Sequence, residues 1–233
     1  CIRDRKVLGK KNFALIVHGN SFPAEKGKNT GFGTPNSNAG KGLIDFASDL
    51  FTAIQLGPAG KTKAVDSSPY TGTIFSTNPL FIDLEALTSK EWKNILSKAT
   101  YEKICNENPN KDTNKTAYSY IFNAQNEALK EAYENFLKLD DKKLKKEFEK
   151  YKKENEAWLE KDSLYEALII ENNNDYWPLW KNETDKRLFN PKNDEDKKAS
   201  FLRIKELKLK YAKEIDFYSF CQFVVNKQNE ETK

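Results

Sequence analysis

The residues whose types and spacing could support chemistry gather in one stretch, residues 57–84. This stretch is rich in glycine, proline and hydroxyl side chains, and it follows a short apolar run over residues 51–56. Long loops without secondary structure are uncommon in compact domains, and those that follow strands often carry function. We therefore predict that residues 57–84 form a functional loop.

Phosphate binding is the first chemistry that this loop suggests, because Gly60, Lys61 and Thr62 match the end of a P-loop motif. The motif also requires a glycine five positions before Gly60, where Gln55 stands. A helix must begin directly after the lysine, so that free N–H groups and the helix dipole face the phosphate. Lys61 instead leads towards Pro69 without such a helix start, and the sequence argues against nucleotide binding.

A single histidine, His18, restricts the catalytic chemistry further. One histidine cannot build a multi-histidine metal site, and no G-x-S-x-G elbow is present for a serine hydrolase mechanism. His18 ends an apolar run next to Gly19. We predict a hydrogen-bonded structural histidine at the mouth of the fold, with a substrate contact as the alternative.

Three blocks of sequence follow one another in an order that is typical of one enzyme family. Residues 13–33 run from FALIVHGNSFP to a GFG turn, residues 56–84 contain LGP, SPY and NPLFIDL, and residues 215–223 are IDFYSFCQF. In these blocks the chain resembles the amylomaltases, which are 4-alpha-glucanotransferases also called disproportionating enzymes. The resemblance is specific over residues 13–84, moderate over residues 201–228 and weak between them.

The resemblance implies an enzyme that transfers α-1,4-glucan segments between maltooligosaccharides by a retaining covalent mechanism, without a cofactor or a metal. In that family the tyrosine after Ser-Pro contacts the donor sugar, which is Tyr70 in this sequence. An aromatic face can cover the apolar C–H side of a glucose ring while the phenol bonds to a sugar oxygen. Ser68 is a polar neighbour, and Asn78 is expected to shape the turn before Pro79, with a sugar contact as the alternative.

The catalytic carboxylates of that family lie on later barrel strands. Their motifs, an arginine–x–aspartate and a histidine–aspartate pair, do not occur in this sequence. We therefore assign no catalytic residue, and Asp45 and Asp83 keep simpler structural interpretations. The 233-residue stretch alone is expected to supply substrate-binding elements and to be inactive. The alternative is a non-catalytic glucan-binding or scaffolding protein derived from the same barrel.

The elements that would position these residues change in character along the chain. Residues 13–18, 36–50 and 51–56 are predicted to form a buried strand, a helix and a second strand, an order that implies parallel strands. After Leu84 the apolar spacing becomes that of amphipathic helices. These helices are expected over residues 89–107, 117–138, 140–160, 163–171 and 196–227.

The expected fold class is α/β, of the (β/α)8 TIM-barrel glycosidase type. A closed barrel needs eight strands and ~250 residues, so this chain would hold the first two β/α units and a large α-helical insertion. Residues 1–84 would be those two units with the substrate loop 57–84. Residues 85–193 would be the helical insertion, and residues 194–233 a long helix that returns to the barrel.

Composition excludes several other classes of protein. Charged residues are 32% of the chain, but the net charge is only +4, so we favour solvated helix faces over a nucleic-acid surface. No run approaches the roughly 18 apolar residues that span a bilayer, and no signal peptide is recognisable, which argues against a membrane protein. The three cysteines are far apart and suggest neither disulfides nor a metal site, as expected in the cytoplasm.

Two further features leave alternatives open. The chain begins with Cys1 and contains no methionine, so it is either a fragment or a sequence with omitted methionines. Of the four tryptophans, Trp92 and Trp158 lie on predicted helices and are expected in the core. Trp177 and Trp180 lie in a predicted loop, where core packing and stacking on glucan are equally open.

Overall fold

The computed structural model describes residues 7–63, 66–70 and 72–233. The chain separates into two compact units. The first comprises Cys1–Asp140 together with Val224–Lys233, and the second comprises Asp141–Phe223. The assignment of residues 1–84, 85–193 and 194–233 to barrel units, insertion and returning helix stays a prediction.

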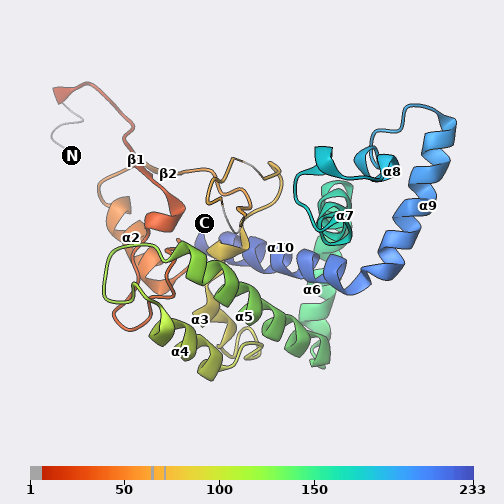
Figure 1. Ribbon diagram of the computed structural model, residues 1–233. Coiled ribbons are helices and arrows are strands. Elements are labelled where there is room, and N and C mark those ends of the chain that lie inside the picture. Colours follow the sequence, from red (N-terminus) through yellow and green to blue (C-terminus); the bar gives the residue numbers. More distant parts are fainter. Residues whose placement is uncertain (1–6, 64–65, 71) are drawn as a thin grey trace. The chain divides into compact units, whose positions relative to one another are not determined.

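The first unit contains a parallel pair of strands, β1 (Ala14–Val17) and β2 (Ala53–Leu56), connected through helix α2 (Asn38–Ser48) (Figure 1). Both strands and the helix occur where the residue pattern predicts them. The Ser37 hydroxyl caps α2 by accepting a hydrogen bond from the Gly40 N–H at 3.0 Å.

The strands are less buried than the sequence predicts. Ile16 in β1 is 70% exposed and Leu56 in β2 is 45% exposed. Parallel strands are usually covered on both faces, which is why their apolar runs predicted burial. Within the described ranges the sheet has two strands, and it leaves these apolar side chains accessible.

Short helices and two long ones complete the first unit. They are η1 (Gly19–Ser21), η2 (Pro79–Phe81), α3 (Leu84–Leu87), α4 (Lys98–Glu107), α5 (Tyr118–Lys138) and the last turns of α10 (Ala212–Thr232).

The predicted helix over residues 89–107 was too long, because α4 begins only at Lys98. Lys93 and Asn94 have φ values of 57° and 51°, a left-handed backbone that a right-handed helix cannot continue.

The second unit is helical. It contains α6 (Lys142–Glu154), α7 (Glu156–Asn172), η3 (Trp177–Leu179), α8 (Glu183–Lys186), α9 (Asp194–Lys210) and the first part of α10. Its core is a cluster of buried apolar side chains, namely Leu164, Leu168, Trp180, Leu188 and Leu207. Arg203 and the buried Asp185 form an ion pair beside this core, with Nε and Oδ1 2.8 Å apart.

The single long helix predicted over residues 196–227 is wrong, because α9 and α10 are separate helices that meet at Tyr211. Tyr211 has φ −114° and ψ 29°, outside helical values. Its hydroxyl donates to the carboxylate of Glu171 on α7, a tertiary contact that no periodicity in α9 or α10 could indicate.

The end of α10 is held to the first unit by buried amide side chains. Gln228 is 3% exposed, and its amide accepts from the Asp83 N–H at 2.8 Å and donates to the Asp83 carbonyl at 3.0 Å. The Asn36 amide donates to Asn229 at 2.9 Å and accepts from the Thr232 hydroxyl at 2.9 Å. These bonds fix the last turns of α10 beside the end of the predicted substrate loop.

Replacing Gln228 with alanine should lower the free energy of unfolding by about 2–3 kcal/mol, because both backbone groups of Asp83 lose their partner. Asn226→Ala is the matched control, since Asn226 is an exposed amide on the same helix. Urea unfolding of both variants measures the difference. Equal stability of the two variants would show that the Gln228 bonds contribute nothing.

Candidate functional site

The predicted substrate loop is closed at its base by Asn78, which is 3% exposed. The Asn78 N–H donates to the Ala59 carbonyl at 2.7 Å, and its side-chain amide donates to the Thr62 hydroxyl at 2.9 Å. Its side-chain oxygen accepts from the Leu80 N–H at 3.1 Å and caps η2. Asn78 therefore joins the two ends of the loop and starts the element that follows it.

A pocket of about 280 Å³ opens between this loop and the end of β1. Its lining combines apolar side chains, Phe32 and Phe81 among them, with polar ones, which include His18, Asn20, Thr62, Ser67, Tyr70 and Tyr118. Tyr118 begins α5, and its hydroxyl donates to the Lys63 carbonyl at 2.7 Å. The pocket thus combines hydroxyl and amide groups with aromatic rings, which suits a neutral polyhydroxylated ligand.

Tyr70 stands at the rim of this pocket, with 79% of the residue exposed. Its backbone N–H points to the Ser68 hydroxyl at 3.4 Å, and the Ser68 N–H donates to the Asp66 carboxylate at 2.9 Å. The structure thus brings Tyr70 and Asn78 to one pocket, whereas Ser68 supports the backbone of the loop and Ser67 lines the cavity.

His18 also lines the pocket and is exposed. A β-carbon on Gly57 would lie 2.3 Å from its Nδ1, so the imidazole rests directly against the Gly57 backbone. Within the described part of the chain, the structure gives the His18 side chain no hydrogen bond, so the predicted hydrogen-bonded structural role is not found. Because Nδ1 faces Gly57, the Nε2 side of the ring is the part of His18 that a ligand in the pocket could contact.

Sequence reasoning missed Thr62, Ser67 and Tyr118 as lining residues. The sequence indicates Thr62 only as part of a P-loop, and in the structure residues 61–63 belong to no helix or strand. Tyr118 is far from the loop in sequence, and no spacing rule could have placed it at this pocket.

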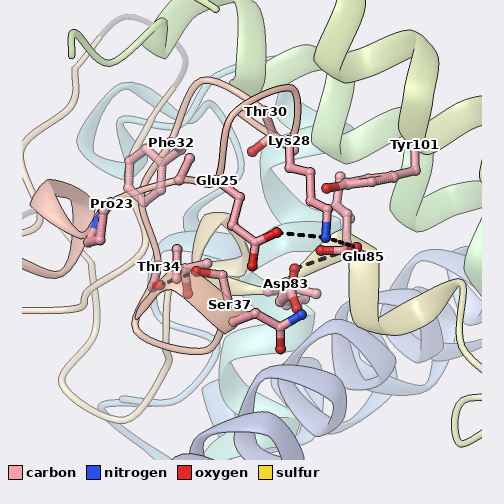
Figure 2. Close-up of a pocket in the computed structure, with 15 residues that line it drawn as sticks. Pro23, Glu25, Lys28, Thr30, Phe32, Thr34, Ser37, Asp83, Glu85 and Tyr101 are labelled. Atoms are coloured by element: carbon pink, nitrogen blue, oxygen red, sulfur yellow. Dashed lines mark hydrogen bonds and ion pairs between the residues drawn. The ribbon is translucent and has the colours of Figure 1, made fainter. Parts of the chain in front are cut away.

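A second, smaller pocket of about 30 Å³ lies where the loop ends at α3, and Figure 2 shows its charged lining. The Lys28 ammonium lies 2.7 Å from Glu25 and 2.8 Å from Glu85, and these hydrogen-bonded carboxylates raise the lysine pKa. Asp83 accepts from the Glu85 N–H at 3.1 Å and caps α3. This volume holds about one water molecule, so the pocket is a structural support rather than a substrate site.

Burial raises the pKa of the Asp83 carboxyl to about 6. The capping bonds favour the ionised form, but they only partly offset desolvation. Asp83 is thus unusual in its ionisation, yet its carboxylate and both its backbone groups are bound within the protein. The sequence did not support a catalytic role for Asp83, and these bonds within the protein do not support one either.

The tryptophans differ in their surroundings. Trp92 and Trp180 are 2% and 3% exposed, so both belong to the core. The Trp158 indole N–H donates to the Asn155 side chain at 2.9 Å on its own helix, and this residue is half-buried. Trp177 alone of the four is strongly exposed, at 51%.

Comparison with known proteins identifies the family. The profile described as 4-alpha-glucanotransferase, of glycoside hydrolase family 77, matches residues 18–233, and the chain belongs to this family. A 4-alpha-glucanotransferase from Clostridium butyricum is 31% identical over 169 residues, which cover 72% of this chain and 30% of that protein.

The fold agrees with this assignment. The amylomaltase from Streptococcus agalactiae in complex with acarbose superposes with a TM-score of 0.75 at 20% identity, over 96% of this chain and 40% of that one. The chain therefore spans less than half the length of either relative. Among the described residues, no helix is both long enough and apolar enough to cross a membrane.

Gly60→Ala should destabilise the loop, because its β-carbon would lie 2.3 Å from the Pro69 carbonyl oxygen and the backbone would have to move. We expect a loss of about 1–3 kcal/mol in the free energy of unfolding. Gly42→Ala is the control, since a β-carbon there, inside α2, meets nothing within 4 Å. That variant should be neutral or stabilised by roughly 0.5–1 kcal/mol. Equal denaturant midpoints for the two variants would contradict the crowding at Gly60.

Asp83 should make the free energy of unfolding fall as the pH rises. Its pKa is raised on folding to about 6, so the folded state binds the proton more tightly. The stabilising effect of protonation is full below the unfolded pKa of ~4 and is lost as the pH rises through about 6. Asp83→Asn keeps a capping oxygen and should remove about 1–3 kcal/mol of the stability difference between those pH values.

Urea unfolding at several pH values, with the exposed Asp45→Asn as control, measures this effect of Asp83. An unchanged pH slope in Asp83→Asn would show that the carboxyl is not perturbed by burial.

Proposed function

We propose that this chain supplies substrate-binding elements of a 4-alpha-glucanotransferase of the amylomaltase type. The enzyme would transfer α-1,4-glucan segments from one maltooligosaccharide to the 4-hydroxyl of another. Membership of the 4-alpha-glucanotransferase family over residues 18–233 carries this proposal. The glucan ligand is supported by the acarbose complex of the amylomaltase with the same fold.

The 280 Å³ pocket supplies a site that fits such a ligand. Its volume is just below the roughly 300–1,000 Å³ of small-molecule sites, enough for part of a glucan chain. An exposed aromatic ring at the rim can cover the C–H face of a glucose residue, and we assign this role to Tyr70. The polar lining, including His18 and Thr62, offers donors and acceptors to the sugar hydroxyls.

Ser68 and Asn78 contribute differently in this proposal. Ser68 positions the Tyr70 backbone through its hydroxyl. The Asn78 side chain donates to Thr62 and accepts from the Leu80 N–H, so its main role is to fix the shape of the loop. A sugar contact by Asn78 would use the part of its surface that faces the pocket.

The chemical step in this proposal proceeds with retention through a covalent glycosyl-enzyme and needs no cofactor. It requires two carboxylates roughly 5–5.5 Å apart, one as the nucleophile and one as the acid and base. Asp66, the acidic residue nearest to Tyr70 in sequence, already accepts the Ser68 N–H. We therefore assign the residues of this chain to binding and none of them to the carboxylate pair.

Tyr70→Ala tests the proposal in the full-length protein. If the ring packs against the sugar that distorts at the cleavage point, its loss should lower kcat more than it raises KM. One aromatic contact and one hydrogen bond suggest a loss of about 2–4 kcal/mol in transition-state stabilisation, or roughly 30- to 1,000-fold in kcat/KM. Disproportionation of maltotriose measures it.

Tyr70→Phe is the matched control, since it keeps the ring and loses only the hydroxyl, and should cost clearly less. Melting temperatures of the three proteins separate a binding role from a packing role. A destabilised Tyr70→Ala protein with normal turnover per folded molecule would rule out the substrate role. A wild-type protein that binds maltooligosaccharides without turnover would instead support the non-catalytic glucan-binding alternative.

A further inference from the structure

The segment around Trp177, in the second unit, has no part in the site proposed above. Tyr176 is 56% exposed, Trp177 51% and Leu179 68%. The other tryptophans are at least half-buried, and Trp158 and Trp180 donate their indole N–H to the protein. Within the described residues, the Trp177 ring and its N–H make no such contact. Exposed apolar side chains that lie next to one another form the kind of patch that marks binding sites.

The segment that carries these rings is held firmly. Trp180 is buried in the core of the second unit, and its ring centroid lies 5.6 Å from that of Tyr165. Its indole N–H donates to the Asn174 carbonyl at 2.7 Å, and the Tyr176 N–H donates to the Asn174 side chain at 2.8 Å. The Tyr165 hydroxyl donates to the Asp175 carbonyl at 2.7 Å. The exposed rings are thus mounted on a short helix, η3, whose two ends are anchored.

We propose that Tyr176 and Trp177 form an additional binding surface for α-1,4-glucan chains, which we call the η3 surface. Rings fixed in advance lose little conformational entropy when a sugar packs on them. A glucan chain presents successive C–H faces to such rings. Its hydroxyls remain free to bond with the exposed Lys181 beside them, whereas the Asn182 oxygen caps α8 and Glu183 pairs with Lys186. The choice of glucan as the ligand rests on the proposed function.

The geometry favours a sugar chain over a protein partner. The exposed apolar side chains of η3 are few, and Lys181, Asn182 and Glu183 follow them directly and are exposed. A stable protein interface buries roughly 800 Å² of surface on each partner. A sugar can instead pack its C–H face on one or two aromatic rings, with hydrogen-bonding groups beside them.

Phe201 provides a matched control within the same unit. It is 57% exposed, similar to Trp177, but the Lys205 ammonium lies 4.3 Å from the centre of its ring. A ring whose face is already covered by a cation offers less surface to a sugar. Trp177→Ala and Phe201→Ala therefore remove similar exposed aromatic area, yet only the first should affect glucan binding.

The test uses the full-length protein in native gels that contain soluble amylose, with retardation giving the apparent Kd. Trp177→Ala and Tyr176→Ala should each raise this Kd roughly 3- to 10-fold, while Phe201→Ala should stay within about twofold of the wild type. Trp177→Phe should recover most of the affinity. Tyr176→Ala and Trp177→Phe keep the test valid should Trp177→Ala fail to fold.

Retardation of Trp177→Ala equal to that of Phe201→Ala would overturn the η3 surface. A fall in molar mass by light scattering, with unchanged retardation, would also overturn it and indicate a contact between protein chains. Maltotriose turnover of the wild type is measured in parallel. If the wild type turns over maltotriose and these substitutions leave the retardation unchanged, only the η3 surface is refuted. If the substitutions weaken retardation but the wild type does not turn over maltotriose, only the proposed function is refuted.

Discussion

The buried amide of Asn78 is the interaction on which the candidate site depends. Its backbone N–H reaches Ala59, its side-chain N–H group reaches Thr62, and its oxygen caps η2. A loop of this length would otherwise sample many conformations, and closing its ends removes much of that entropy in advance. The pocket between the loop and the end of β1 can keep its shape because these bonds join both ends of the loop.

The rest of the first unit supports that closure. The last turns of α10 hold Asp83 through Gln228, and Asn36 is bonded to Asn229 and Thr232. The segment that leaves the loop is therefore fixed by residues from the start and the end of the chain. Buried amides suit this task, because each satisfies a donor and an acceptor without a charge to desolvate. These hydrogen bonds hold the loop from which the exposed Tyr70 side chain projects.

The sequence predicted the local elements well where one physical signal dominated. Apolar runs marked the strands, and a stripe of apolar residues marked α5 over Tyr118–Lys138. The resemblance of the sequence to the amylomaltases also predicted the correct family, the 4-alpha-glucanotransferases. Tertiary contacts could not be predicted. They include the hydrogen bond from Tyr211 to Glu171 at the break between α9 and α10, and the approach of Tyr118 to the loop. Within the site, Tyr70 could be proposed from the SPY motif, while the lining contributed by distant residues could not.

A crystal structure of the full-length protein with a bound maltooligosaccharide tests the central claim most directly. The account predicts a glucose residue against the face of Tyr70, with its hydroxyls bonded to the polar lining of the pocket and with the Asn78 bonds to Ala59 and Thr62 intact. A glucan bound in the catalytic cleft while Tyr70 remains in solvent without a sugar contact would contradict it.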